Sequence, residues 1–121
     1  YGADPDHIYL MGFSQGAATA YATAIRHPGL VKGIAGLVGF VPVESDAAIE
    51  TRVLRGLPIH TAVGKEDPYI PLSRARGCAE TLRASGADLT YYEYDVGHRI
   101  SAQGMRDLKL WWEQRASDLV R

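Results

Sequence analysis

The chain has 121 residues, of which 46% are hydrophobic and 22% charged, as is ordinary for a single folded domain. Lys and Arg together number 13 against 14 for Asp and Glu, and the absence of a basic stripe argues against a nucleic-acid partner. No apolar run approaches the ~20 residues that span a membrane. The single cysteine, Cys78, excludes a disulfide within the chain and fits a reducing compartment, so we expect a cytoplasmic protein.

The first predicted elements are a strand and a helix joined by a tight turn. Residues 7–11 (HIYLM) are apolar and rich in strand formers. Residues 15–26 are rich in alanine, the best helix former, and His27-Pro28-Gly29 then ends the helix. Residues 31–40 predict a second strand, whose unbroken apolar character is typical of a strand buried on both faces of a parallel sheet.

The rest of the chain continues the alternation. Residues 44–55 are polar with scattered apolar positions, and we expect a loop or a short helix that covers the sheet. A third strand is predicted over 59–64 and a helix with one apolar face over 72–84. Residues 89–94 are β-branched and aromatic, which favours a fourth strand, and a last amphipathic helix is predicted over 102–119.

This order predicts an α/β fold, with a parallel sheet and crossover helices flanking it. Ligands of such sheets bind beyond the carboxyl ends of the strands. Three of the four predicted strands are followed at that edge by a polar candidate residue, namely Ser14, Asp67 and His98. We therefore expect these three side chains to meet.

The turn after the first strand reads Gly12-Phe13-Ser14-Gln15-Gly16, the G-x-S-x-G pattern of a nucleophile elbow between a strand and a helix. Two backbones approach closely in such a turn, so we expect a side chain at Gly12 or Gly16 to collide with a neighbour. Ser14 is expected to adopt a sparsely populated backbone conformation that holds its Oγ above the sheet. The amide of Gln15, without a partner inside the helix, would face a developing oxyanion.

A serine hydroxyl needs a base within hydrogen-bond reach, and the chain offers four histidines. We favour His98, which follows the last strand at the same edge of the sheet as Ser14. His7 begins the first strand at the opposite edge, where a surface position is expected. His27 lies at a helix end, and His60 lies inside a strand, where we expect a packed or hydrogen-bonded core residue.

For the acid that orients the base we favour Asp67, because it follows the neighbouring strand and because Pro68 favours an extended backbone before it. Asp95 is the second candidate, although it could instead cap a turn. Glu66, next to Asp67, would point elsewhere. The chain order Ser, Asp, His is the order expected of an α/β-hydrolase triad.

Four stretches carry a family resemblance: residues 10–17 (LMGFSQGA), 39–42 (GFVP), 64–67 (GKED) followed by Ile70-Pro71, and Gly97-His98. They resemble the phospholipase/carboxylesterase family of α/β-hydrolases, which includes the acyl-protein thioesterases, and the ending resembles its bacterial carboxylesterase branch. The resemblance implies a serine hydrolase that cleaves carboxylic esters or thioesters through an acyl-enzyme, without a cofactor. It makes Ser14 the nucleophile, Asp67 the acid, His98 the base and the Gln15 amide an oxyanion donor.

Family members carry about as much chain again before the elbow, including further strands and a His-Gly loop with the second oxyanion donor. We therefore expect residues 1–121 to be the C-terminal portion of one α/β-hydrolase domain. The first strand would then be an open edge, to be covered by a missing N-terminal half or a partner chain. The isolated 121 residues are expected to be nearly inactive, since losing one oxyanion donor typically costs on the order of 10²–10³ in kcat.

Other functions have less support. No His/Cys cluster has metal-ligand spacing, and the lysine of a phosphate loop is missing after Gly16. Cys78 lies beside an apolar helix face, which favours packing. A peptidase or a dienelactone-hydrolase-like enzyme remains an alternative, although the latter usually has cysteine at the elbow. A non-catalytic α/β module, with an interface at its exposed edge and aromatic last helix, is the alternative outside the enzymes.

Overall fold

The computed structural model describes residues 8–27, 29–39 and 54–119. The elements in these ranges are β1 (Tyr9–Phe13), α1 (Gln15–Arg26), β2 (Gly33–Leu37), β3 (Pro58–Gly64), α3 (Leu72–Ala84), β4 (Asp88–Tyr94) and α4 (Ala102–Leu119). The three predicted long helices are confirmed with their bounds. β1 lies two residues later than predicted, and β2 is shorter than the predicted strand. Most of the polar segment at 44–55, namely residues 44–53, lies outside the described residues.

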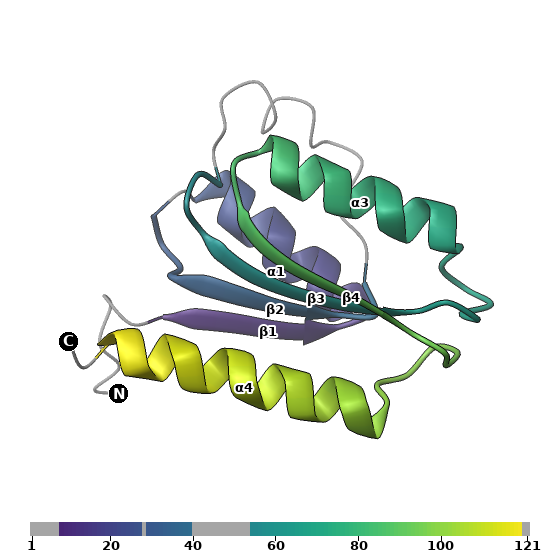
Figure 1. Cartoon of the computed structure of the whole chain (residues 1–121). Coiled ribbons are helices and arrows are strands. Elements are labelled where there is room, and N and C mark those ends of the chain that lie inside the picture. The colour runs from purple at the N-terminus through teal and green to yellow at the C-terminus, as the bar shows by residue number, and fades with distance from the viewer. Residues whose placement is uncertain (1–7, 28, 40–53, 120–121) are drawn as a thin grey trace.

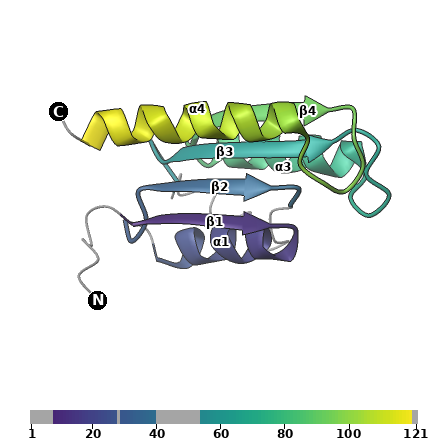
Figure 2. The same cartoon turned by 90° about the horizontal axis from the view of Figure 1, so that it is seen from below.

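The four strands form one parallel sheet in the order β1-β2-β3-β4, which confirms the α/β prediction. Figure 1 shows α1 and α3 over one face of this sheet and α4 along the other. In Figure 2 the sheet is seen from below, with α4 in front and all four arrows pointing the same way. The carboxyl ends of all four strands therefore lie at one edge.

The helix α1 is anchored to the sheet through one tyrosine. A Cβ at Gly36 of β2 would lie 1.9 Å from the Tyr21 hydroxyl, so only glycine leaves room for that ring. The hydroxyl is 2.8 Å from Oγ1 of Thr61 in β3, a buried hydrogen bond. Small residues of α1 pack beside this contact, and the helix therefore lies close to β1 and β2. These residues are Ala17, Ala20 and Ala24. The start of α1 is thereby held at the carboxyl edge of the sheet.

On the other face, α4 covers a second apolar cluster. Leu108 and Trp111 pack there against small residues of β2 and β3. His60 of β3 is completely buried under this helix, with its ring centroid 5.8 Å from that of Trp111 and 5.5 Å from that of Tyr92. Neither of its ring nitrogens has a hydrogen-bond partner among the described residues. The expectation of a packed core histidine is confirmed, and burial lowers its pKa, although the negative charge of Asp107 acts in the opposite direction.

Within the described residues, β1 pairs with β2 alone, so its other side is an edge of the sheet. Two large apolar side chains of this edge strand are exposed, Met11 at 62% and Phe13 at 47%. An edge strand of this kind offers unpaired backbone groups to another strand. None of the helices in the described ranges has the length and apolar character of a membrane span.

The burial of His60 predicts a pH-dependent stability. Because the folded pKa is below the ordinary value of about 6.5, stability is present above that pH and is lost as the pH falls through the folded pKa. The free energy of unfolding, measured with urea between about pH 7 and pH 5, should fall with a slope of at most about 1.4 kcal/mol per pH unit for one proton. His60→Phe should flatten this slope.

The matched control is His27→Gln, because the His27 side chain at the end of α1 is exposed. This variant should keep the slope of the parent protein. Equal slopes in the parent protein and in His60→Phe would contradict the prediction.

Candidate active site

Ser14 lies at the junction of β1 and α1 with φ 57° and ψ −115°. A non-glycine residue in such a region typically costs about 1–3 kcal/mol, so the surrounding structure must hold it there. Its amide donates a 2.8 Å hydrogen bond to the carbonyl of Leu37 at the end of β2. The expected strained turn is confirmed, and Gln15 begins the helix directly after it.

The two elbow glycines, Gly12 and Gly16, differ in the room that each has for a side chain. A Cβ at Gly12 would lie 2.2 Å from the carbonyl carbon of Gly16, so a side chain there would collide with the first turn of α1. A Cβ at Gly16 would have no heavy atom of the described residues within 4 Å. The predicted collision at Gly16 is therefore wrong for these residues, because Gly16 contributes its backbone to the close contact at Gly12, while the position that its own Cβ would take is open.

The loops after β3 and β4 lie against each other. The Glu66 amide donates a 3.0 Å hydrogen bond to the carbonyl of Val96, extending the pairing of the two strands. A Cβ at Gly64 would be 2.1 Å from the carbonyl oxygen of Gly97, so this approach requires glycine at position 64. The residues that follow on the two loops, Asp67 and His98, are thereby brought together.

The Asp67 carboxylate has partners on both oxygens. Its Oδ1 accepts hydrogen bonds from the amides of Tyr69 at 2.7 Å and Ile70 at 3.0 Å. Its Oδ2 is 2.6 Å from Nδ1 of His98, and its side chain is only 1% exposed. Burial acts to raise the pKa of Asp67, but the hydrogen bonds from His98, Ile70 and Tyr69 outweigh it and the pKa lies below its usual value. An ionised carboxylate can only accept, so Nδ1 of His98 carries a proton.

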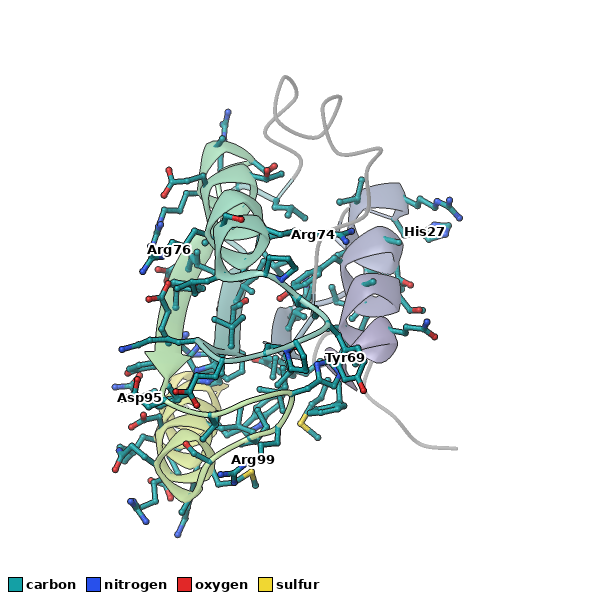
Figure 3. The ribbon with its side chains drawn as sticks, turned by 90° about the vertical axis from the view of Figure 1, so that its right-hand side faces the viewer. His27, Tyr69, Arg74, Arg76, Asp95 and Arg99 are labelled. Atoms are coloured by element: carbon teal, nitrogen blue, oxygen red, sulfur yellow. The ribbon has the colours of Figure 1, made fainter. Side chains whose placement is uncertain are left out.

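The other ring nitrogen of His98, Nε2, is 3.0 Å from the Ser14 Oγ. Two aromatic rings contact the imidazole edge-on, that of Phe13 with a centroid distance of 5.5 Å and that of Tyr69 with 5.1 Å. Ser14, Asp67 and His98 thus form one connected chain of hydrogen bonds at the carboxyl edge of the sheet, the edge that faces the viewer in Figure 3. The arrangement could move a proton from the hydroxyl to the ring.

The remaining candidates lie elsewhere. Asp95 is exposed and pairs with Lys65 at 3.1 Å. Figure 3 shows Asp95 beside the end of β4, away from Tyr69. His60 lies under α4, on the face of the sheet opposite α1. His27 ends α1, with its amide bonded to the Thr23 carbonyl at 2.9 Å, and His7 lies outside the described residues.

Cys78 packs partly buried against the apolar cluster under α1 and α3, as expected. Among the residues that the structure describes, no group of three or more His, Cys, Asp or Glu side chains is arranged to hold a metal ion.

A pocket of about 370 Å³ opens beside the serine, and its lining is Ser14, Gln15, Tyr69, Ile70, Arg74 and His98. Sequence reasoning did not find Tyr69 and Arg74. The available signal was their position, since Tyr69 stands two residues after the predicted acid and Arg74 lies in the first turn of the helix that follows. Both lie at the same edge of the sheet as Ser14.

Comparison with known proteins finds a family model, curated relatives and solved structures that are similar to this chain. The family model described as Phospholipase/Carboxylesterase matches residues 1–114. A protein named as a probable inactive carboxylesterase from Oryza sativa is 28% identical over 93% of this chain and 47% of its own length. Acyl-protein thioesterase 1 from Gibberella zeae is 32% identical over 80% of this chain and 43% of its own. The crystal structure of Arabidopsis thaliana SOBER1 matches with a TM-score of 0.81 and 25% identity, over 95% of this chain and 56% of that one.

The Asp67 carboxylate accepts hydrogen bonds both from the His98 ring and from two backbone amides, and we therefore predict different effects for two substitutions. In Asp67→Asn the amide oxygen can still accept from Tyr69 and Ile70, while the NH₂ group must donate to Nδ1 of His98. The ring proton should therefore move to Nε2, as measured by ¹⁵N NMR of the imidazole. Asp67→Ala should in addition lower the free energy of unfolding by about 1–3 kcal/mol, because two amides lose their acceptor.

Asp95→Asn is the control, because Asp95 is exposed and pairs only with exposed Lys65 among the ion pairs of the described residues. It should leave both the tautomer and the stability unchanged within about 0.5 kcal/mol. A ring proton that stays on Nδ1 in Asp67→Asn would show that Asp67 does not set the tautomer.

Proposed function

Because this chain belongs to the phospholipase/carboxylesterase family, we propose that the complete protein is a serine hydrolase that cleaves carboxylic esters or thioesters. Membership alone does not decide activity, since one relative is named as inactive. The observation that supports the proposal most is the chain of contacts from Ser14 Oγ to His98 Nε2 at 3.0 Å and from His98 Nδ1 to Asp67 at 2.6 Å. This short Ser14–His98 distance also argues against the non-catalytic alternative, and no observation favours a peptidase.

In the first half of the proposed reaction, Ser14 Oγ forms a bond to the carbonyl carbon of the substrate while His98 Nε2 takes the hydroxyl proton. The electron pair of the C=O bond moves to the oxygen, which accepts a hydrogen bond from the Gln15 amide at the start of α1. Asp67, ionised and bonded to Nδ1, favours the charged ring. His98 then gives its proton to the leaving oxygen or sulfur, the bond to the acyl carbon breaks, and an acyl group remains on Ser14.

In the second half, a water molecule attacks the acyl carbon and gives a proton to His98. The oxyanion collapses, the bond to Ser14 breaks, and His98 returns the proton to Oγ. One water is consumed for each ester or thioester, and one acid and one alcohol or thiol are released. This chemistry involves no cofactor.

We further propose that residues 1–121 form the C-terminal portion of one α/β-hydrolase domain. The chain spans 44%, 47% and 51% of the lengths of three of the curated relatives that it matches, which is about half. β1 is an edge strand within the described residues, and beside it runs an apolar groove of about 760 Å³ with Met11, Leu37 and Trp112 in its lining. A preceding half of the domain, or a partner chain, would cover this surface and supply the second oxyanion donor. The cytoplasmic location stays a prediction.

The first test is covalent labelling of the complete protein by a fluorophosphonate. Ser14 should be phosphonylated with one label per chain, because His98 activates its hydroxyl, and Ser14→Ala should abolish the labelling. Ser73→Ala serves as the control, since Ser73 is an exposed serine of α3 outside the pocket lining, and this variant should label fully. A complete, folded protein that takes up no label would rule out the proposed function.

The second test compares the 121 residues with a chain that includes the preceding half. The turnover of a 4-nitrophenyl ester should be lower in the shorter chain by on the order of 10²–10³, the usual cost of one oxyanion donor. Equal kcat values for the two chains would contradict the domain proposal and leave the nucleophile assignment intact.

A further inference from the structure

His98, the proposed base, lies on the loop of residues 95–101, which turns from the end of β4 into α4 (Figure 1). The start of this loop is bound to the loop after β3, because the Val96 carbonyl accepts a 3.0 Å hydrogen bond from the Glu66 amide. Within the described residues, no backbone hydrogen bond joins residues 97–100 to the sheet or to the loop after β3. The backbone of His98 is therefore positioned by the two ends of its loop, and the second end is the start of α4.

One side chain of β4 holds the start of α4 in place. The Tyr94 hydroxyl donates a 2.5 Å hydrogen bond to Oδ2 of Asp107, in the second turn of α4. The Tyr94 ring lies against the first turn, since a Cβ at Gly104 would be 3.3 Å from its Cε2. Burial and the hydrogen bond to Asp107 raise the pKa of Tyr94, so the phenol keeps the proton that it donates. The last residue of β4 is thus tied to the helix that follows the His98 loop.

Two further hydrogen bonds order this start of α4. Ser101 Oγ accepts a 2.9 Å hydrogen bond from the Gly104 amide and so satisfies one of the free donors of the first turn. Gln103 Nε2 donates a 2.9 Å hydrogen bond to Oδ1 of Asp107, so both oxygens of this carboxylate are occupied. A phenol bonded to a carboxylate at so short a distance belongs to the stronger hydrogen bonds of proteins. The bond between Tyr94 and Asp107 is therefore the main polar link between β4 and the start of α4 within the described residues.

We propose that Tyr94 and Asp107 are positioning residues for the hydrolysis, and that their hydrogen bond holds the loop so that His98 Nε2 stays within reach of Ser14 Oγ. This inference rests on the proposed hydrolase function and adds two residues to it. Neither residue belongs to the lining of the pocket beside Ser14 that the described residues form, so both act through His98. A displacement of a reacting group by about 1 Å can cost on the order of 10² in rate.

The test compares two variants of the complete protein, each of which loses one phenol hydroxyl. Tyr94→Phe keeps the ring against α4 but removes the donor to Asp107. The kcat for a 4-nitrophenyl ester and the rate at which a fluorophosphonate labels Ser14 should both fall about ten- to a hundredfold, because His98 is the base in both reactions.

Tyr91→Phe is the matched control. The Tyr91 hydroxyl donates a 2.7 Å hydrogen bond to Glu93, which is also a residue of β4. This bond stays within one strand and does not reach the His98 loop, so Tyr91→Phe should keep both rates of the parent protein.

Three further variants separate positioning from a general loss of structure. Asp107→Ala removes the same bond from the other side and should lower both rates as Tyr94→Phe does. Asp107→Asn, whose amide oxygen can still accept from the Tyr94 hydroxyl, should retain most of the parent rates. In a His98→Ala background, Tyr94→Phe should leave the residual rate unchanged within about twofold, because the imidazole that the bond positions is then absent.

Two outcomes would overturn the inference while leaving the hydrolase function intact. One is that Tyr94→Phe and Asp107→Ala both keep the rates of the parent protein. The other is a loss that is as large in the His98→Ala background, or that Asp107→Asn shows in full, since either result would indicate a role that does not act through His98. Failure of the hydrolase function would look different, because the parent protein itself would then cleave no ester and take up no label, and the inference would fall with it.

Discussion

The Asp67 carboxylate accepts three hydrogen bonds, one from the His98 ring and two from the backbone amides of Tyr69 and Ile70. One buried side chain therefore sets both the orientation of the imidazole and the path of the loop that forms a wall of the pocket. A buried charge is stable only when its oxygens are satisfied, and these three donors satisfy them. The position of the pocket wall relative to Ser14 thus depends on the same group that polarises the proposed base.

The turn between β1 and α1 is the second constraint on the site, because it fixes the position of Ser14. Ser14 is held in a backbone conformation that serine rarely adopts, and the surrounding structure offsets the cost of this conformation. The offset comes from the hydrogen bond to Leu37, from the parallel pairing of β1 with β2, and from the close approach of α1 that Gly12 permits. Regular structure on both sides thereby places a strained serine in reach of His98.

Much of this arrangement could be predicted from the sequence, because its causes are local. The alanine-rich run and the His-Pro-Gly stop determine α1, and polar residues after parallel strands must share one edge of the sheet, which brings Ser14, Asp67 and His98 together. The end of β1 was misplaced because Gly12 and Phe13 looked like part of the turn, whereas they pair in register with Gly36 and Leu37.

Features that depend on three-dimensional packing could not be predicted. The sequence pattern makes Gly16 equivalent to Gly12, but the open space around a Cβ at Gly16 is a property of the assembled elbow. The place of Arg74 in the pocket follows from the Asp67 turn, which sets where α3 begins. The lack of hydrogen-bond partners for His60 among the described residues likewise emerges only when α4 covers the sheet.

The most direct measurement of the central claim is a crystal structure of the complete protein after reaction with a fluorophosphonate. The account predicts a bond between phosphorus and Ser14 Oγ, with the phosphoryl oxygen about 2.7–3.1 Å from the Gln15 amide nitrogen, as in an oxyanion hole. It also predicts that His98 keeps its contact with Asp67 in the product. Phosphorus bound to another residue, or a phosphoryl oxygen turned away from the Gln15 amide, would contradict the account.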